Sequence, residues 1–174
     1  MEELLILVDE DDKALGGMDK LSVHQKGLLH RAFSIFIFNS KGQLLLQQRA
    51  NDKYHSGGLW TNTCCSHPRL GEELATAVER RLAEEMGMHC HAEFIFSFTY
   101  KMEFENGLTE HEYDHVFFGR SDDIPVINPL EVKDFKYMTL EDLVQAIDLH
   151  PEDFSAWLKI CLPKVNEHFH RISN

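Results

Sequence analysis

The sequence predicts an α/β (α+β) fold in which helices flank a mixed β-sheet. Two observations support this prediction: short apolar runs typical of strands dominate the middle of the chain, and amphipathic helical segments lie among and after them. The chain has 174 residues, the length of one typical domain, and no linker rich in Pro, Gly or Ser divides it. We therefore expect residues 1–174 to form a single domain.

The expected strands are short runs of apolar and aromatic residues, at 4–8, 33–38, 43–48, 94–100 and 113–119. Asn-Ser-Lys-Gly, between the second and third of these runs, is typical of a tight turn. We therefore expect the second and third runs to pair as a hairpin. The polar stretch at 51–58, which ends in two glycines, is expected to be a loop.

Three helices are expected, at 72–86, 139–147 and 154–168. The first is the clearest, because apolar side chains recur every four residues from Leu74 to Met86, and Gly87 suits the position just after a helix. The second begins with the capping pattern Thr-x-x-Asp.

The composition excludes several classes of protein. A hydrophobic fraction of 43% and a charged fraction of 26% are ordinary for a globular protein. The net charge of −12 argues against binding to nucleic acid, which requires Lys and Arg to neutralise phosphates. Apolar runs fall short of the roughly 20 residues that cross a bilayer, and the acidic flanks of the first run do not suit a signal peptide. We expect a cytoplasmic protein that binds neither nucleic acid nor membrane.

One segment carries a recognisable chemical pattern. Its helical end reads RRLAEEMG, in which Arg81 and Glu85 are neighbours on one helix face, an arrangement that is usually just a solvated surface. The wider segment resembles the Nudix signature GX5EX7REUXEEXGU, where U is aliphatic, and the matching residues are Glu72, Arg80, Leu82, Glu84, Glu85 and Gly87. Two positions depart from it. Ser66 replaces the first glycine, and Arg81 replaces a glutamate that helps Nudix hydrolases hold their catalytic metal.

Five segments make the resemblance more specific. They are KLSVHQKGLLHR at 20–31, RANDK at 49–53, WTNTCCSHP at 60–68, EHE at 110–112 and FSAW at 154–157. With these segments the chain resembles the type I isopentenyl-diphosphate isomerases of the Nudix superfamily, from about residue 5 to residue 157. The resemblance implies a Nudix fold. It also implies interconversion of isopentenyl diphosphate and dimethylallyl diphosphate in isoprenoid biosynthesis, without flavin or nicotinamide.

The sequence also offers ligands for a metal ion. Glu110 and Glu112 are two residues apart, so in an extended strand both side chains project from one face. Imidazole and carboxylate groups together suit Mn²⁺ or Mg²⁺, and Zn²⁺ is a further option. The family resemblance implies that five residues hold one divalent ion: His24, His30, His67, Glu110 and Glu112. The remaining histidines, among them His55, match no ligand of the family.

The resemblance further implies a site for the diphosphate. A second Mg²⁺ is expected on Glu85 and the backbone carbonyl of Cys65, because Mg²⁺ commonly binds through one or two carboxylates and substrate phosphates. Four residues match the diphosphate-binding cations of the family: Lys20, Arg49, Lys53 and Arg81. Arg81 thus replaces a metal-binding glutamate with a guanidinium fork that suits phosphate oxygens.

Moving the double bond of an unactivated alkene requires one group that donates a proton and another that removes one. The path is expected to pass through a carbocation, so water must be excluded and an aromatic face can stabilise the charge. The resemblance implies Cys65 and Glu112 as the acid–base pair, Tyr100 as hydrogen-bond partner of the acid, and Trp157 against the isopentenyl group. We favour Glu112 as the donor and leave the opposite order open. The adjacent Cys64 should face the other way and be dispensable.

Two other functions are weighed against the isomerase. A Nudix hydrolase of a nucleoside or another diphosphate is disfavoured by Arg81 and leaves Cys65 and Tyr100 without roles. A non-catalytic module that binds metal or diphosphate would tolerate replacement of Cys65. The expected partner is the small-molecule substrate alone, and the resemblance implies a monomer or a weak homodimer.

Overall fold

A mixed sheet runs through the molecule. The computed structural model describes residues 3–174 of the chain. Within this range nine strands form the sheet: β1 (Leu4–Val8), β2 (Ala14–Asp19), β3 (His30–Phe38), β4 (Leu44–Arg49), β5 (Trp60–Thr61), β6 (Cys64–Ser66), β7 (Ala92–Glu103), β8 (Thr109–Arg120) and β9 (Val132–Met138). The described helices are α1 (Lys20–Lys26), α2 (Leu74–Met86), α3 (Leu140–Leu149), α4 (Ala156–Ser173) and the 3₁₀ turn η1 (Pro151–Asp153). From residue 3 onward, no helix is long and apolar enough to span a membrane.

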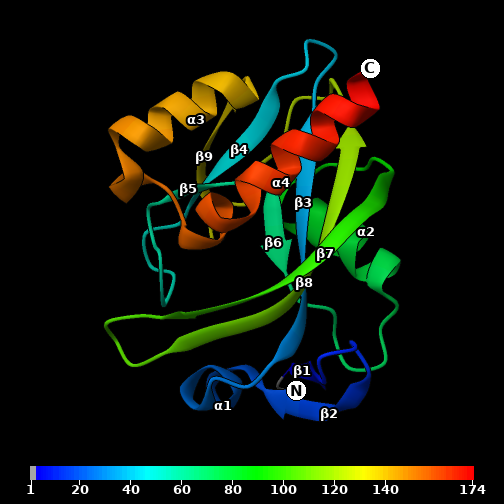
Figure 1. Cartoon of the computed structure of the whole chain (residues 1–174), viewed down its shortest axis with the longest axis vertical. Coiled ribbons are helices and arrows are strands. Elements are labelled where there is room, and N and C mark those ends of the chain that lie inside the picture. The colour runs from blue at the N-terminus through cyan, green and yellow to red at the C-terminus, as the bar shows by residue number, and fades with distance from the viewer. Residues whose placement is uncertain (1–2) are drawn as a thin grey trace.

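Strand β3 is the centre of the sheet (Figure 1). It pairs with β8 in parallel, from His30 opposite Glu112 to Phe38 opposite Arg120. The short strand β6 pairs with β3 in antiparallel fashion, and its Cys65 lies opposite Ser34. Because residues 33–35 of β3 pair with both β6 and β8, these two strands lie at opposite edges of β3. The register of β3 therefore sets the position of Cys65 relative to Glu112.

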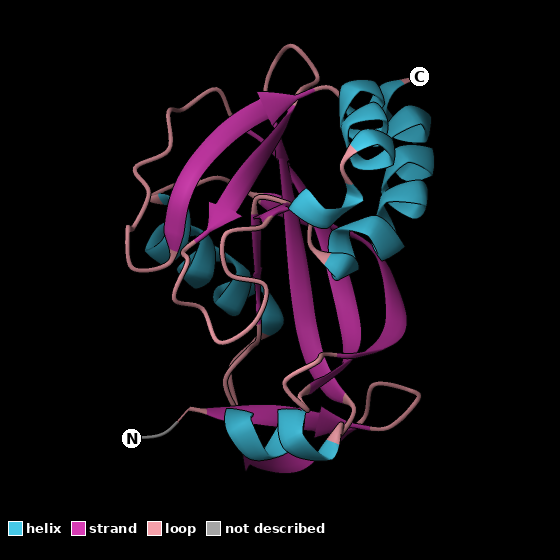
Figure 2. Ribbon diagram, turned by 90° about the vertical axis from the view of Figure 1, so that its left-hand side faces the viewer, coloured by secondary structure: helices cyan, strands magenta, loops and turns pink. Residues whose placement is uncertain are grey.

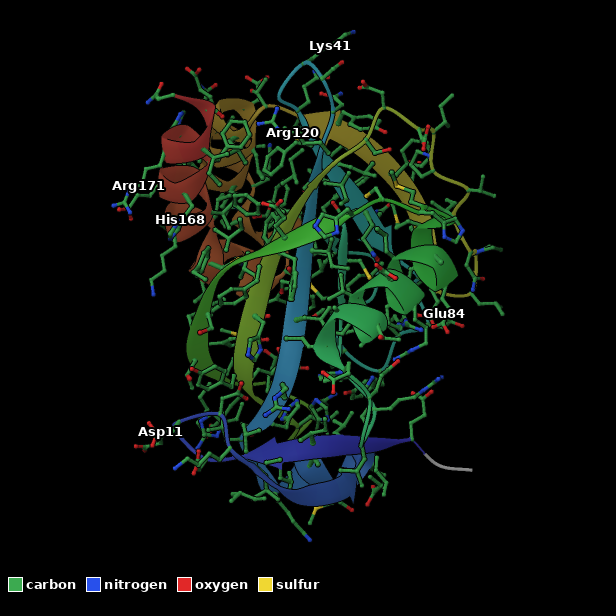
Figure 3. The ribbon with its side chains drawn as sticks, turned by 90° about the vertical axis from the view of Figure 1, so that its right-hand side faces the viewer. Asp11, Lys41, Glu84, Arg120, His168 and Arg171 are labelled. Carbon is green, nitrogen blue, oxygen red and sulfur yellow. The ribbon has the colours of Figure 1, made fainter. Side chains whose placement is uncertain are left out.

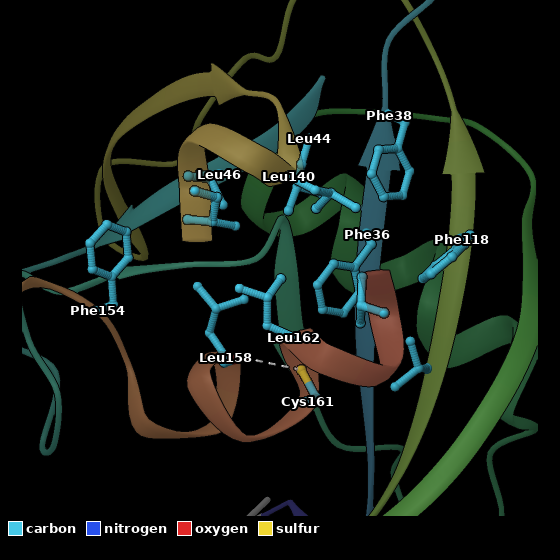
Figure 4. Packing of buried hydrophobic residues seen from close by; sticks show 13 residues of the cluster. Phe36, Phe38, Leu44, Leu46, Phe118, Leu140, Phe154, Leu158, Cys161 and Leu162 are labelled. Carbon is cyan, nitrogen blue, oxygen red and sulfur yellow. Dashed lines mark hydrogen bonds between the residues drawn. The ribbon is translucent and has the colours of Figure 1, made fainter. Parts of the chain in front are cut away.

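Alternate residues of β3 face two different cores, because successive side chains of a strand point to opposite faces. Phe36 and Phe38 pack with α3 and α4, in the cluster drawn in Figure 4. Phe33, Ile35 and Ile37 pack with α2 instead. The sheet is the middle of three layers, with α2 on one side and α3 and α4 on the other (Figure 2). The predicted fold class, a mixed sheet flanked by helices, is confirmed.

A long hairpin of β7 and β8 sweeps away from the centre of the sheet (Figure 1). Each strand has 12 residues, and only 104–108 separate them. The predicted strands, at 94–100 and 113–119, are shorter, and most of the segment between them is also paired strand. Its polar residues fit a strand because one face of this ribbon lines a pocket. Glu110 and Glu112 consequently lie on β8, with both side chains on the pocket face.

The N-terminal segment forms a small unit at one end of the sheet. β1 pairs with β2 and briefly with β3, and α1 follows directly, capped by the carboxylate of Asp19. Only β1 was predicted here. β2 is mostly exposed and contains two glycines, and α1 has seven residues, too few to display a helical period. Figure 3 shows Asp11, in the turn between β1 and β2, at this end of the molecule, and Lys41, in the turn after β3, at the other.

The predicted hairpin of β3 and β4 is limited to its turn. The two strands pair only at Phe38 and Leu44. β4 pairs instead with β9, a strand that was not predicted, while β3 pairs with β8. The hairpin prediction was wrong beyond the turn, because turn residues indicate where the chain reverses and not how far the strands stay together.

The three predicted helices are present with shifted ends. α2 begins at Leu74 because the backbone of the preceding Glu73 is extended, with φ −67° and ψ 139°. The carboxylate of Glu72 accepts from the guanidinium of Arg80 at 2.7 Å. α4 begins at Ala156, after the cap Ser155, because the residues before it form η1. The capping threonine predicted for α3 accepts from the backbone N–H three residues on, at 3.1 Å.

Phe36 is expected to stabilise the larger core. Its side chain is fully buried and its ring centroid lies 5.9 Å from that of Phe118. Phe36→Ala should lower the free energy of unfolding by about 3–5 kcal/mol through lost burial and a residual cavity. Urea unfolding measures this change. Leu149→Ala is the control, since this leucine is 74% exposed. A loss below about 1 kcal/mol for Phe36→Ala would contradict the assignment, because that is no more than an average substitution costs.

Candidate active site

A pocket opens beside β6, β8 and the loop that follows β4. Most residues predicted for the site line it: Lys20, Arg49, Lys53, Cys65, His67, Arg81, Glu85, Tyr100, Glu110, Glu112 and Trp157. His24 and His30 lie against His67 and are fully buried. Residues from both ends and the middle of the chain therefore meet at one place. Their chemical roles remain predictions at this point.

The three predicted histidine ligands converge through their Nε2 atoms. Nδ1 of His24 is 2.6 Å from the carbonyl oxygen of Lys20, and Nδ1 of His30 is 2.9 Å from that of Leu28. A carbonyl oxygen only accepts, so each Nδ1 carries a proton and each neutral ring presents an Nε2 lone pair. The Nε2 atoms of His30 and His67 are 3.2 Å apart.

Two carboxylates face these lone pairs. Oε1 of Glu110 is 3.3 Å from Nε2 of His24, and Oε1 of Glu112 is 3.0 Å from Nε2 of His67 and 3.6 Å from that of His30. A lone pair beside a carboxylate is unfavourable unless a proton or a metal ion lies between them. Nε2 of His24 has no hydrogen-bond partner among residues 3–174. The ligand atoms of the three histidines and Glu112 lie within 4.8 Å of one another, so this donor set fits a divalent metal ion.

The electrostatics favour a cation at the same point. Burial acts to raise the pKa of Glu112, but a proton on Nε2 of His30, together with contacts to Glu110 and the hydroxyl of Tyr100, outweighs burial and lowers the pKa of Glu112 to about 2. The O–H of Tyr100 donates to Oε2 of Glu112 at 2.8 Å. Burial and Glu112 act to raise the pKa of Glu110, but contacts with two histidines outweigh them and its pKa is lowered. Both carboxylates are therefore ionised at neutral pH.

The thiol of Cys65 is held by its neighbours. Its S–H donates to Oδ1 of Asn62 at 2.9 Å, and the indole N–H of Trp157 donates to the sulfur at 3.1 Å. The hydroxyl of Ser34 lies 3.4 Å from the sulfur. Burial and the nearby Asp114 raise the pKa of Cys65, so the sulfur carries its proton in this state.

The adjacent Cys64 faces away from the pocket. It is fully buried in the core cluster with α2, because successive residues of β6 point to opposite sides. The predicted orientation is therefore confirmed.

The predicted cations lie among acidic partners. Arg81 is paired with Glu85, one turn along α2, and Lys53 with Glu131. The Nε–H groups of Arg49 and Arg81 are buried without a hydrogen-bond partner in the described part of the chain. A buried donor without a partner costs free energy, so these two groups indicate an anionic ligand.

Glu85, predicted to hold a second metal ion, uses both oxygens within the protein. Oε1 accepts from Arg81, and Oε2 accepts from Nε2 of Gln47 at 2.8 Å. Each oxygen keeps a second lone pair, which could bind a metal ion.

Several pocket residues were missed by the sequence analysis. His55 lies on the loop after β4, with its Nε2 2.8 Å from Oε1 of Glu110, and Tyr54 lines the pocket beside it. Asn62 and Ser34 surround the thiol. A loop has no hydrophobic period, so the only available signal was the pair of aromatic rings in an otherwise polar segment.

Comparison with known proteins gives a consistent result. Residues 28–158 match the family described as NUDIX domain. Isopentenyl-diphosphate Delta-isomerase of Pectobacterium atrosepticum is 50% identical over 165 residues, which cover 95% of this chain and 92% of the relative. Isopentenyl-diphosphate Delta-isomerase 2 of Aromatoleum aromaticum is 54% identical over 165 residues, 95% of this chain and 87% of the relative.

Solved structures agree on the fold. A protein from Deinococcus radiodurans superposes with a TM-score of 0.79 at 23% identity, covering 93% of this chain and 98% of that one. The MutT protein of Methanosarcina mazei superposes with a TM-score of 0.67 at 18% identity, covering 84% of this chain and 96% of that one. At these identities the structures bear on the fold alone, and they confirm the predicted Nudix architecture.

A divalent cation should stabilise the protein through the histidine cluster. Adding Mn²⁺ at 100 times its Kd should raise the free energy of unfolding by about 2.7 kcal/mol, because only the folded chain assembles the ligands. His67→Ala should remove most of this gain. Denaturant unfolding with and without Mn²⁺ measures it.

His150→Ala is the matched control, because His150 belongs to an exposed group with Glu152 and Asp153. It should keep the full gain. An equal effect of Mn²⁺ on His67→Ala and on the unaltered protein would contradict a metal site at the cluster.

Proposed function

The chain belongs to the isopentenyl-diphosphate Delta-isomerases of the Nudix fold, and on this premise we propose that its pocket moves the double bond of isopentenyl diphosphate to give dimethylallyl diphosphate. One observation carries the proposal. A thiol and a carboxylate suited to proton transfer, Cys65 and Glu112, share a pocket with a metal-ligand cluster and with cations suited to a diphosphate.

The acid–base pair reaches the pocket from two strands at opposite edges of β3. Cys65 comes from β6 and Glu112 from β8. Isomerisation requires one group to protonate a carbon of the alkene and the other to remove a proton from a neighbouring carbon. We propose that the substrate's hydrocarbon chain lies between these two groups, with Tyr100 orienting Glu112 through the hydrogen bond from its O–H.

The pair shares one transferable proton. In this state it is on Cys65, whose pKa burial raises, whereas Glu112 is ionised. The donor and acceptor exchange roles when the reaction runs backward. We favour Glu112 as the proton donor in the direction that forms dimethylallyl diphosphate. Because Glu112 is ionised in this state, it must gain a proton when substrate binds.

The carbocation needs protection from water and a partner for its charge. Trp157 is 4% exposed, and its indole N–H is fixed on the sulfur of Cys65. We propose that its ring faces the isopentenyl group, where an aromatic face attracts positive charge without reacting with it. The reaction also requires that water be kept from the cation, because water would trap it.

We propose Mg²⁺ or Mn²⁺ at the cluster of His24, His30, His67, Glu110 and Glu112, with Zn²⁺ as an option, and a second Mg²⁺ at Glu85 and the Cys65 carbonyl. When bound, these ions supply positive charge that tunes the proton affinity of Glu112 and neutralises the diphosphate. Lys20, Arg49, Lys53 and Arg81 bind the diphosphate directly. The Nε–H groups of Arg49 and Arg81, which have no hydrogen-bond partner among residues 3–174, support this role.

Cys65→Ala should lower kcat by at least about 100-fold, because it removes one member of the acid–base pair. Proton NMR with isopentenyl diphosphate and Mg²⁺ in D₂O measures the reaction, through dimethylallyl signals and deuterium incorporation. Cys64→Ala is the matched control and should keep most of the activity, since Cys64 faces the core.

Two results would contradict the proposal. Loss of activity in Cys64→Ala but not in Cys65→Ala would show that Cys64, and not Cys65, is the catalytic thiol. Release of phosphate without isomerisation would indicate a Nudix hydrolase instead.

A further inference from the structure

His55 lines the pocket but is neither a proposed metal ligand nor part of the acid–base pair. It lies on the loop at 50–59, between β4 and β5, and its side chain is 7% exposed. A polar ring buried at this depth needs hydrogen-bonding and packing partners. Residues of β8, of the turn between β7 and β8, and of α4 provide them.

The ring of His55 is fixed by packing on two sides. It stacks on Phe104, with ring centroids 4.8 Å apart and an angle of 14° between the planes. It meets Trp157 edge-on, at 5.9 Å and 86°. These contacts direct Nε2 toward Glu110, whose Oε1 is 2.8 Å away.

The backbone around His55 is fixed as well. Ser56 adopts a φ of 53°, a left-handed conformation that is uncommon outside glycine. At Gly57 a Cβ atom would overlap the carbonyl oxygen of Asn51, so only glycine fits there. The carbonyl of His55 accepts from Nη2 of Arg49 at 3.3 Å. Such backbone strain persists only where the surroundings enforce it and is common at functional sites.

The position of the proton on the neutral His55 ring makes this side chain a hydrogen-bond donor to Glu110. Its Nε2 faces the carboxylate of Glu110, which only accepts, so the proton of the neutral ring is on Nε2. Nδ1 is 3.3 Å from the hydroxyl of Ser56, which can donate to it. The O–H of Tyr100 reaches the other oxygen of Glu110 at 3.3 Å. Tyr100 has one proton, and its 2.8 Å contact with Glu112 is the shorter of the two, so the N–H of His55 is the closest donor to Glu110. The carboxylate is held with Oε1 facing the lone pair of His24.

We propose that His55 is a positioning residue, which holds the carboxylate of Glu110 in the orientation that binds the divalent ion. This inference rests on the proposed metal-dependent function. Groups that hydrogen-bond to a metal ligand fix its direction, and their loss typically weakens metal binding about 10- to 100-fold.

Two substitutions separate the hydrogen bond of His55 from its packing. His55→Phe keeps a flat ring on Phe104 but removes the donor to Glu110, and should raise the Kd for Mn²⁺ about tenfold. His55→Gln loses the ring but keeps an N–H donor of similar reach, and should bind Mn²⁺ nearly as tightly as the unaltered chain. The paired result distinguishes positioning of Glu110 from support of the loop.

The Kd is measured on the full chain without substrate, by following free Mn²⁺ in solution by electron paramagnetic resonance. His67→Ala is the reference for loss of a ligand, and His150→Ala is the control for exposed histidines. Thermal unfolding without metal, recorded for each variant, shows whether it is folded.

Tenfold weakening in folded His55→Phe, with recovery in His55→Gln, is the expected result. Unchanged Mn²⁺ binding in His55→Phe, together with its loss in His67→Ala, would overturn the role of His55 and leave the proposed function intact. Weakening in both His55 variants would also overturn it, because packing and not the donor would then be responsible. Unchanged binding in His67→Ala would overturn the metal cluster itself and this inference with it.

Discussion

Burial of three carboxyl groups on one face of β8 is the constraint on which the pocket depends. Glu110, Glu112 and Asp114 alternate along the strand, and none is more than 7% exposed. Unpaired charges at this depth are strongly destabilising. Histidines from α1, β3 and the segment after β6 face the two glutamates, while burial and the charge of Glu112 raise the pKa of Asp114 well above its usual range. The proposed metal ion would complete this neutralisation.

The parallel pairing of β3 with β8 makes the arrangement possible. It sets His30 beside Glu112, and at the other edge of β3 the pairing with β6 sets Cys65 beside Ser34. A shift of one residue would turn these side chains to the opposite face of the sheet. The positions of the acid–base pair therefore follow from one strand register. On α2, Arg81 stands where the Nudix signature has a metal-binding glutamate, and its position among the pocket cations suits binding of a diphosphate rather than metal-dependent cleavage.

The residues that line the pocket were easier to predict from the sequence than the pairing of the strands. Cys65, His67 and Glu112 sit in short segments whose residue types and spacing are distinctive, and all three line the pocket. The pairing of β3 with β8 joins segments far apart in the chain and leaves no local signal. β9 and β2 were missed because their mixed and partly exposed residues have no clear period. His55 was missed because its burial depends on contacts with distant elements.

Anomalous X-ray scattering from crystals soaked with Mn²⁺ would locate the metal ion directly. We expect a strong manganese peak in contact with Nε2 of His24, His30 and His67 and with the carboxylates of Glu110 and Glu112. Manganese bound only at Glu85 or at the exposed group around His150, with none beside His67, would contradict it.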